Sequence, residues 1–172
     1  FSTILTWMQE KIKPVFVVAT ANDISQLPPE FLRKGRFDEI FFVDLPTKEE
    51  RKEILRIHLS KNNQTGIHEL DGLADATRLF NGAEIEEAVK ESMFMAYVDN
   101  PTNPIVNVHH LETACTQIIP LAKTMSEKIR GLRAWADDRA RRASIIANQE
   151  LLPENQVDIK KTKREKDEDT FG

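Results

Sequence analysis

A run of apolar residues near the start of the chain constrains its fold most strongly. Residues 15–19 are continuously apolar and rich in β-branched side chains, a pattern typical of a strand buried on both faces of a parallel sheet. Polar Thr20 and Asn22 follow this run, and a second apolar run at residues 40–43 ends shortly before Pro46. The two runs predict strands of an α/β domain, in which ligands gather at the carboxyl ends of the strands.

Helical patterns dominate the rest of the chain. Residues 1–12 carry apolar side chains at helical spacing, and a short helix is expected over residues 28–35. Thr47 with Glu50, and Asn81 with Glu84, have the spacing of helix caps. The first pair predicts a helix over residues 48–60. Beyond residue 62 the pattern predicts helices over residues 70–79, 83–98, 108–119 and 126–148, with no strand among them.

Composition narrows the function classes. The 24 Lys and Arg residues against 28 Asp and Glu residues give a net charge of −4. This charge does not indicate a protein that coats nucleic acid or an anionic membrane. A single cysteine, Cys115, excludes an internal disulfide and fits a cytoplasmic setting. No apolar stretch approaches the roughly 20 residues that cross a bilayer. The chain begins with Phe1 inside a helical pattern, so we expect it to start partway through a longer protein.

Several common motifs are missing from the sequence. No pair of glycines has the spacing of a phosphate-binding loop. The four histidines include no metal-binding pattern, and neighbouring His109 and His110 would point about 100° apart on a helix. We therefore expect no metal site in this chain.

Two sets of polar residues could carry chemistry. Asn22 follows the first predicted strand, where its amide could position a water or a phosphate oxygen, although spacing alone favours a role as a turn cap. Arg33 and Arg36 flank Gly35 and could grip a phosphate through their planar, permanently charged guanidinium groups. The alternative is a solvated surface pair, with Arg36 bridging Asp38.

The combined pattern resembles a known family. A strand ending in A-T-A-N (residues 19–22), the spacer L-P-P-E-F-L, the segment R-K-G-R-F-D-E-I (residues 33–40) and the capped helix that follows are similar to the second region of homology in AAA+ ATPases. The resemblance covers roughly residues 1–120. The later segment P-L-A-K-T-M-S-E-K-I-R-G-L-R-A-W-A looks most like the poorly characterised AAA proteins of cyanobacterial and plastid type and their bacterial relatives.

The resemblance implies an organisation for the chain. It predicts the C-terminal portion of a parallel-sheet α/β ATPase core over residues 1–62, followed by a helical lid subdomain over residues 63–122. Beyond these subdomains the spacing of apolar residues, and not the resemblance, predicts an additional helix over residues 123–152. Its apolar stripe around Trp135 is expected to pack within the chain, with packing on a neighbouring subunit as the alternative. The last part, residues 153–172, has a segment of almost continuous charge and is expected to be disordered.

The resemblance also implies roles for particular residues. Asn22 matches the sensor 1 position, which orients the attacking water. Arg33 and Arg36 match arginine fingers, which act in trans on the nucleotide of a neighbouring subunit. The positions that contact adenine and ribose match Ile54, His58, Gly82 and Ala83. From the residues alone, Ile54 and His58 share one helix face, and His58 would be an ordinary surface histidine.

The function implied is ATP hydrolysis by a ring-shaped homo-oligomer, a hexamer, which remodels a protein or an assembly. ATP and Mg²⁺ would serve the full-length protein, while this chain lacks the Walker A and Walker B motifs and is expected to be inactive alone. Two departures weaken the match: Glu84 follows Gly82-Ala83 where many branches carry an arginine, and Lys34 replaces a common proline.

A different class of function is a nucleotide-independent binding module. Its partner, a protein or a nucleic acid, would be held by a basic surface comprising Arg139, Arg141, Arg142 and the lysine-rich residues 160–166. Acidic residues interrupt the lysine-rich segment, and no aromatic residues are placed to stack on bases. A nucleic-acid partner is therefore the less favoured of the two.

Overall fold

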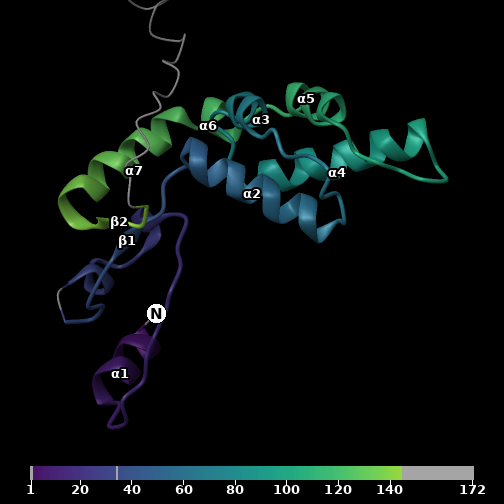
Figure 1. Ribbon diagram of the computed structural model, residues 1–172. Coiled ribbons are helices and arrows are strands. Elements are labelled where there is room, and N and C mark those ends of the chain that lie inside the picture. The colour runs from purple at the N-terminus through teal and green to yellow at the C-terminus, as the bar shows by residue number, and fades with distance from the viewer. Residues whose placement is uncertain (1, 34, 145–172) are drawn as a thin grey trace, which may run out of the picture.

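The computed structural model describes residues 2–33 and 35–144 and consists mainly of helices with one small parallel sheet (Figure 1). The helices are α1 (Ser2–Glu10), α2 (Lys48–Lys61), α3 (Asp71–Ala76), α4 (Gly82–Asp99), α5 (Val108–Gln117), α6 (Leu121–Thr124) and α7 (Ser126–Arg139). Two single turns of 3₁₀-helix occur at Ile24–Gln26 and Pro29–Leu32. Strand β1 (Phe41–Phe42) pairs in parallel with β2 (Arg141–Arg142).

Helices α2 to α5 pack around one apolar core. Leu55 of α2, Ile85 of α4 and Leu111 of α5 are completely buried there, together with Leu73 of α3. These side chains come from the apolar stripes that the sequence pattern predicts, and burying such stripes supplies most of the stability of short helices. The helical subdomain therefore has a core of its own.

Both predicted helix caps are confirmed. The Thr47 hydroxyl accepts the Glu50 N–H at 3.3 Å, while a Glu50 carboxylate oxygen accepts the Thr47 N–H at 2.8 Å. Asn81 and Glu84 make the same reciprocal pair at 2.9 and 2.8 Å. Each pair satisfies two backbone N–H groups that a helix start would leave without partners.

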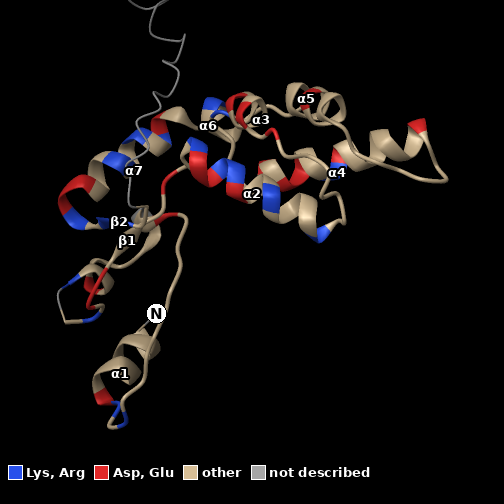
Figure 2. Ribbon diagram, viewed as in Figure 1, with Lys and Arg blue, Asp and Glu red and all other residues tan. Residues whose placement is uncertain are grey.

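Charged side chains join the surfaces of α2 and α3. Basic and acidic residues lie close together along α2 (Figure 2). The Lys48 ammonium group lies 2.8 Å from a carboxylate oxygen of Asp75, and the Lys52 ammonium group lies 2.6 Å from one of Asp71. Because these carboxylates are largely exposed, the pairs add little free energy beyond that of the core.

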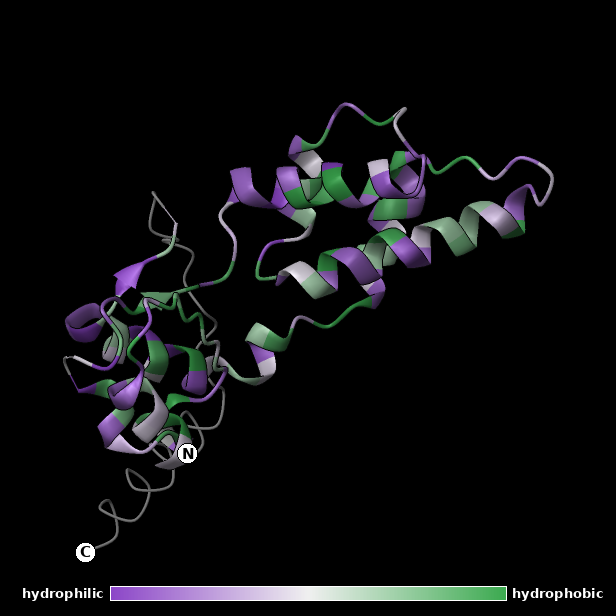
Figure 3. Cartoon of the chain, turned by 90° about the horizontal axis from the view of Figure 1, so that it is seen from below, coloured by the Kyte–Doolittle hydropathy of each residue, from purple (hydrophilic) through white to green (hydrophobic). Residues whose placement is uncertain are grey.

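The N-terminal part of the chain lies beside the helical subdomain and not within its core (Figure 3). Phe31 is buried, and its ring stacks on that of Phe37 with centroids 6.3 Å apart. A guanidinium nitrogen of Arg36 donates to the Leu5 carbonyl oxygen at 3.4 Å, which links α1 to the loop before β1. The predicted strand over residues 40–43 is confirmed in the shorter form of β1.

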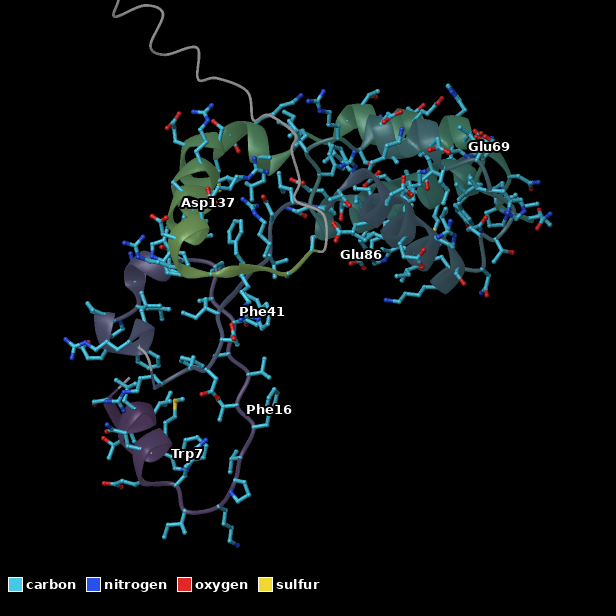
Figure 4. All side chains as sticks on the ribbon, turned by 60° about the vertical axis from the view of Figure 1, so that its left-hand side comes forward. Trp7, Phe16, Phe41, Glu69, Glu86 and Asp137 are labelled. Carbon is cyan, nitrogen blue, oxygen red and sulfur yellow. The ribbon has the colours of Figure 1, made fainter. Side chains whose placement is uncertain are left out.

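The prediction of a buried strand over residues 15–19 is wrong for this structure. Residues 14–20 have neither helical nor strand hydrogen bonding, and Phe16 projects into solvent with 93% of its surface exposed (Figure 4). A strand buried on both faces needs a neighbour on each side and a layer above and below it. Among the described residues, the sheet consists of β1 and β2, and neither pairs with this segment.

The predicted helix over residues 126–148 is too long, and the region beyond residue 62 is not free of strands. Helix α7 ends at Arg139, and the backbone then becomes extended and forms β2. The Arg141 N–H donates to the Ile40 carbonyl at 2.8 Å, and the Ala143 N–H donates to the Phe42 carbonyl at 2.9 Å. These bonds to β1 replace the helical bonds that the local pattern favours. Residues 145–172, including the predicted tail, lie outside the described residues.

Helix α7 packs within the chain, as its apolar stripe predicts. Ile129 packs against a small cluster formed by Leu79 and Ala122, to which Leu45 also contributes. The short helix α6, which was not predicted, provides Ala122 and leads directly into α7. None of the helices in the described part of the chain is long and apolar enough to span a bilayer.

Candidate functional site

A groove of about 660 Å³ lies between β1, α2, α4 and α7. Phe42 and Leu45 come from β1 and the turn after it, Ile54 from α2, and Gly82 from the first turn of α4. Ile129 and Leu132 of α7 complete the apolar part of the lining. The volume lies within the range of about 300–1,000 Å³ that is typical of small-molecule sites.

The charged part of the lining is acidic, and Asn81 and Ser144 add neutral polar groups. Asp44, Glu50 and Glu53 line the groove, and its lining includes no lysine or arginine among the described residues. Two of these carboxylates have cationic partners: Asp44 is paired with Arg133, and Glu53 with Arg56 on the next turn of α2. Such a groove suits a neutral ring with hydrogen-bond donors better than it suits a phosphate group.

Local contacts fix the ionisation of Glu50. Burial raises the pKa of this carboxyl, but hydrogen bonds from the Thr47 backbone, from Ser144 and from the Thr47 hydroxyl outweigh that effect and leave the pKa below its usual value. Glu50 is therefore charged at neutral pH. Its bond to Ser144 also connects the start of α2 to the segment that follows β2.

An ion pair attaches α7 to the end of β1. Asp44 is largely buried, and one of its carboxylate oxygens accepts from Nε and Nη2 of Arg133 at 3.0 and 2.9 Å. The same oxygen accepts the Leu45 N–H at 2.8 Å. Arg142 approaches the other oxygen at 3.6 Å. This charge cluster holds one side of the groove together.

We expect Asp44→Asn to loosen α7, because the substitution removes the charge that two arginines face. Removing one partner of a buried ion pair typically costs about 3–5 kcal/mol of stability. Because Arg133 and Arg142 are partly exposed, we expect the cost here to be about 3 kcal/mol or less. Hydrogen exchange of the α7 amides should accelerate while that of α4 stays unchanged. Asp138→Asn, at an exposed position on the same helix, is the matched control. Equal exchange in both variants would contradict the attachment.

The structure brings together some of the residues proposed to contact nucleotide. Ile54 and Gly82 are far apart in sequence but line the same groove. His58, one helical turn after Ile54, is half-buried and is not among the lining residues, and exposed Ala83 does not line the groove either. Their expected contacts with adenine and ribose remain predictions.

The residues proposed for catalysis lie outside this groove. Asn22 and Arg33 are exposed, and Arg36 is half-buried through its contact with α1. Beside Asn22, the Asp23 carboxylate pairs with the ammonium group of Lys128 on α7 at 2.8 Å. The exposed position of Arg33 leaves it accessible to a second molecule.

Sequence reasoning did not identify the contribution of α7 to the groove. The apolar stripe of α7 was visible in the sequence, but nothing local indicates that Leu132 faces the same space as Ile54 and Gly82. The described residues include no group of three or more His, Cys, Asp or Glu side chains that could hold a metal ion. The ring of His110 instead contacts Asp99, with Nε2 2.9 Å from a carboxylate oxygen.

The fold is that of part of an AAA domain. The structure superposes on the crystal structure of the FIGL-1 AAA domain in complex with ADP with a TM-score of 0.51 and 18% sequence identity, covering 61% of this chain and 39% of that one. The arrangement corresponds to the C-terminal part of an α/β ATPase domain with its helical lid.

Sequence comparison finds similarity to the AAA family. Residues 1–45 match the model of the ATPase family associated with various cellular activities (AAA). The uncharacterized AAA domain-containing protein ycf46 of Pyropia yezoensis is 49% identical over 151 residues, which are 84% of this chain and 30% of that protein. The proteasome-activating nucleotidase of Sulfurisphaera tokodaii is 39% identical over 104 residues, which are 60% of this chain and 26% of that protein. The chain is similar to these AAA proteins over most of its length and spans less than a third of the length of each.

Proposed function

We propose that this chain is the C-terminal part of an ATPase module that acts in a ring-shaped homo-oligomer, a hexamer, and uses ATP hydrolysis to remodel a protein or an assembly. One observation carries the proposal: Ile54 and Gly82, which match adenine-contacting positions of the family, line one apolar groove. The solved AAA domain that the fold resembles is in complex with ADP. We assign the base and ribose of ATP to this groove.

The proposal divides the chain by role. Residues 1–62 contribute Asn22 as sensor 1, and Arg33 and Arg36 as arginine fingers that serve a neighbouring nucleotide. Residues 63–122 form the lid, and residues 123–152 form an additional segment that begins with α7. AAA ATPases in general use ATP with Mg²⁺. No cluster of carboxylates in the described residues suits a metal ion, so we assign no Mg²⁺ ligand and propose that this chain is inactive alone.

The proposed role of Arg33 rests on its charge and exposure. A guanidinium group placed against the transferring phosphoryl group neutralises the negative charge that develops there. Arg33 is exposed on the loop between the turn Pro29–Leu32 and β1. This exposure supports a role at a nucleotide held by another subunit.

Binding of adenosine to the 172-residue chain tests the groove assignment. Because the lining is apolar and acidic and includes no cation, we expect adenosine to bind weakly and ADP to bind no more tightly. Adenosine should shift the backbone amide signals of Ile54 and Gly82 in NMR spectra. Uridine serves as the control for a smaller ring. An unchanged spectrum at both residues would refute the base groove, and much tighter binding of ADP would show that the chain also holds phosphates.

The structure gives less support to a nucleotide-independent binding module. Arg141 and Arg142 of its proposed basic surface are engaged within the chain. The Arg141 guanidinium lies 3.1 Å from a carboxylate oxygen of Glu39, and that of Arg142 lies 2.7 Å from one of Asp137. These contacts leave two of the three arginines named for that surface, Arg141 and Arg142, partly neutralised.

A further inference from the structure

We infer that helix α7 forms a wall of the base groove and that Leu132 packs against the ring of a bound purine nucleoside. The inference rests on the proposed function, because it takes the groove as the site of the base. It goes beyond that function by assigning part of the site to α7, which lies outside the residues, roughly 1–120, over which the sequence resembles the family. The chemical class of ligand is a neutral, planar heterocycle carrying an amino group.

The positions of Ile129 and Leu132 on α7 support this assignment. The two residues are three apart, so they project from the same face of the helix, and both line the groove. Ile129 also packs against Leu79 and Ala122, which gives it a structural role. Within the described residues, Leu132 belongs to neither apolar cluster, although it is only partly exposed. Its apolar surface is therefore available to a ligand in the groove.

Neighbouring contacts hold Leu132 in place. The next residue, Arg133, is fixed to the largely buried Asp44, which itself lines the groove. One turn earlier, Lys128 pairs with Asp23, and after the helix β2 bonds to β1. These contacts occur before, beside and after Leu132. The wall that it provides is thus positioned before a ligand arrives, and such preorganisation lowers the entropic cost of binding.

The chemistry of the groove favours a purine ring. Ile54 and Leu132 offer branched aliphatic surfaces, which bury the face of a planar ring without competing for hydrogen bonds. The carboxylates of Glu50 and Glu53 can accept hydrogen bonds from an exocyclic amino group. A phosphate would meet these same negative charges without a cation in the lining.

The experiment measures adenosine affinity for the 172-residue chain with Leu132→Ala and with Leu121→Ala. Leu121 is 49% exposed on α6, so its variant controls for the loss of a leucine side chain outside the groove. Truncation at Leu132 should weaken adenosine binding about tenfold, as expected for lost apolar contact in a pocket. The Leu121 variant should bind within about twofold of the unaltered chain, because surface substitutions have small effects.

NMR shifts separate this inference from the proposed function. Adenosine-induced shifts at Ile54, Gly82 and Leu132 support both. Shifts at Ile54 and Gly82 with none in α7, and unchanged affinity in Leu132→Ala, would overturn the inference and leave the proposed groove intact. No shifts at any of the three would overturn both. If the alanine variant unfolds, the shift at Leu132 in the unaltered chain decides the matter, because that measurement needs no substitution.

Discussion

Arg33→Ala in the full-length protein is expected to reduce ATP turnover by about 10³-fold or more and to leave ATP binding almost unchanged. The magnitude follows from the rate contribution of about 10³–10⁵ that arginine fingers make in other NTPases. Arg33→Lys should restore little, because an ammonium group cannot reproduce the planar, two-pronged contact of guanidinium. Steady-state ATPase assays and nucleotide-binding titrations measure the two effects separately.

A mixing experiment tests whether the arginine acts between subunits. Subunits carrying Arg33→Ala retain their own Asn22, and subunits carrying Asn22→Ala retain their own Arg33. If Arg33 serves a neighbouring nucleotide, mixed oligomers should regain part of the activity that each pure variant lacks. Arg78→Ala, at an exposed position after α3, is the matched control and should turn over normally. Normal turnover of Arg33→Ala would remove the arginine-finger assignment.

Leu55→Ala is expected to destabilise the helical subdomain by about 2–5 kcal/mol, because truncating a fully buried leucine loses apolar contact and leaves a cavity. Leu55 is completely buried where α2 meets the core. This loss is a large part of the total stability of about 5–15 kcal/mol that is typical of a domain. Urea unfolding followed by far-UV circular dichroism measures it.

The control for this prediction is again a leucine at the surface. Leu121→Ala removes the same atoms from a side chain that is 49% exposed, and its effect should stay within about 0.5 kcal/mol. A midpoint for Leu55→Ala equal to that of the control would mean that α2 does not depend on the core formed with α4. A lower slope of free energy against urea would instead indicate a change in the surface exposed on unfolding.

The helices could be predicted because their signals are local. Thr47 and Glu50, like Asn81 and Glu84, lie within one turn of each other, so their mutual hydrogen bonds depend on few other parts of the fold. The apolar stripes of α2 and α4 likewise indicated the side that would be buried. Sequence alone therefore predicted the existence of these helices and their starts to within a residue.

Elements that depend on distant partners could not be predicted in this way. The segment at residues 15–19 has the composition of a central strand, but strand formation requires a neighbour, and the described residues supply none. The predicted end of α7, at residue 148, was wrong for the opposite reason, namely that a strand partner is present. A partner for Arg141 exists at Ile40, but its distance in sequence hides it from any local pattern.

The candidate site, too, could be predicted only in part from the sequence. Resemblance to the family indicated Ile54 and Gly82, and the fold places both in one groove. Their contacts with nucleotide remain predictions, as do the roles of Asn22, Arg33 and Arg36. The place of Leu132 in the lining depends on how α7 packs beside β1. The sequence pattern of α7 does not indicate that packing.

The pairing of β1 with β2 has a consequence for the groove. The chain enters the helical subdomain just after β1 and returns through β2, and the two strands are hydrogen-bonded side by side. Both connections therefore meet at one place, so one short region of backbone joins the helical subdomain to the N-terminal part of the chain. Phe42 and Ser144, which belong to or follow these two strands, both line the groove, so a ligand held there would contact the chain where it enters the helical subdomain and where it returns.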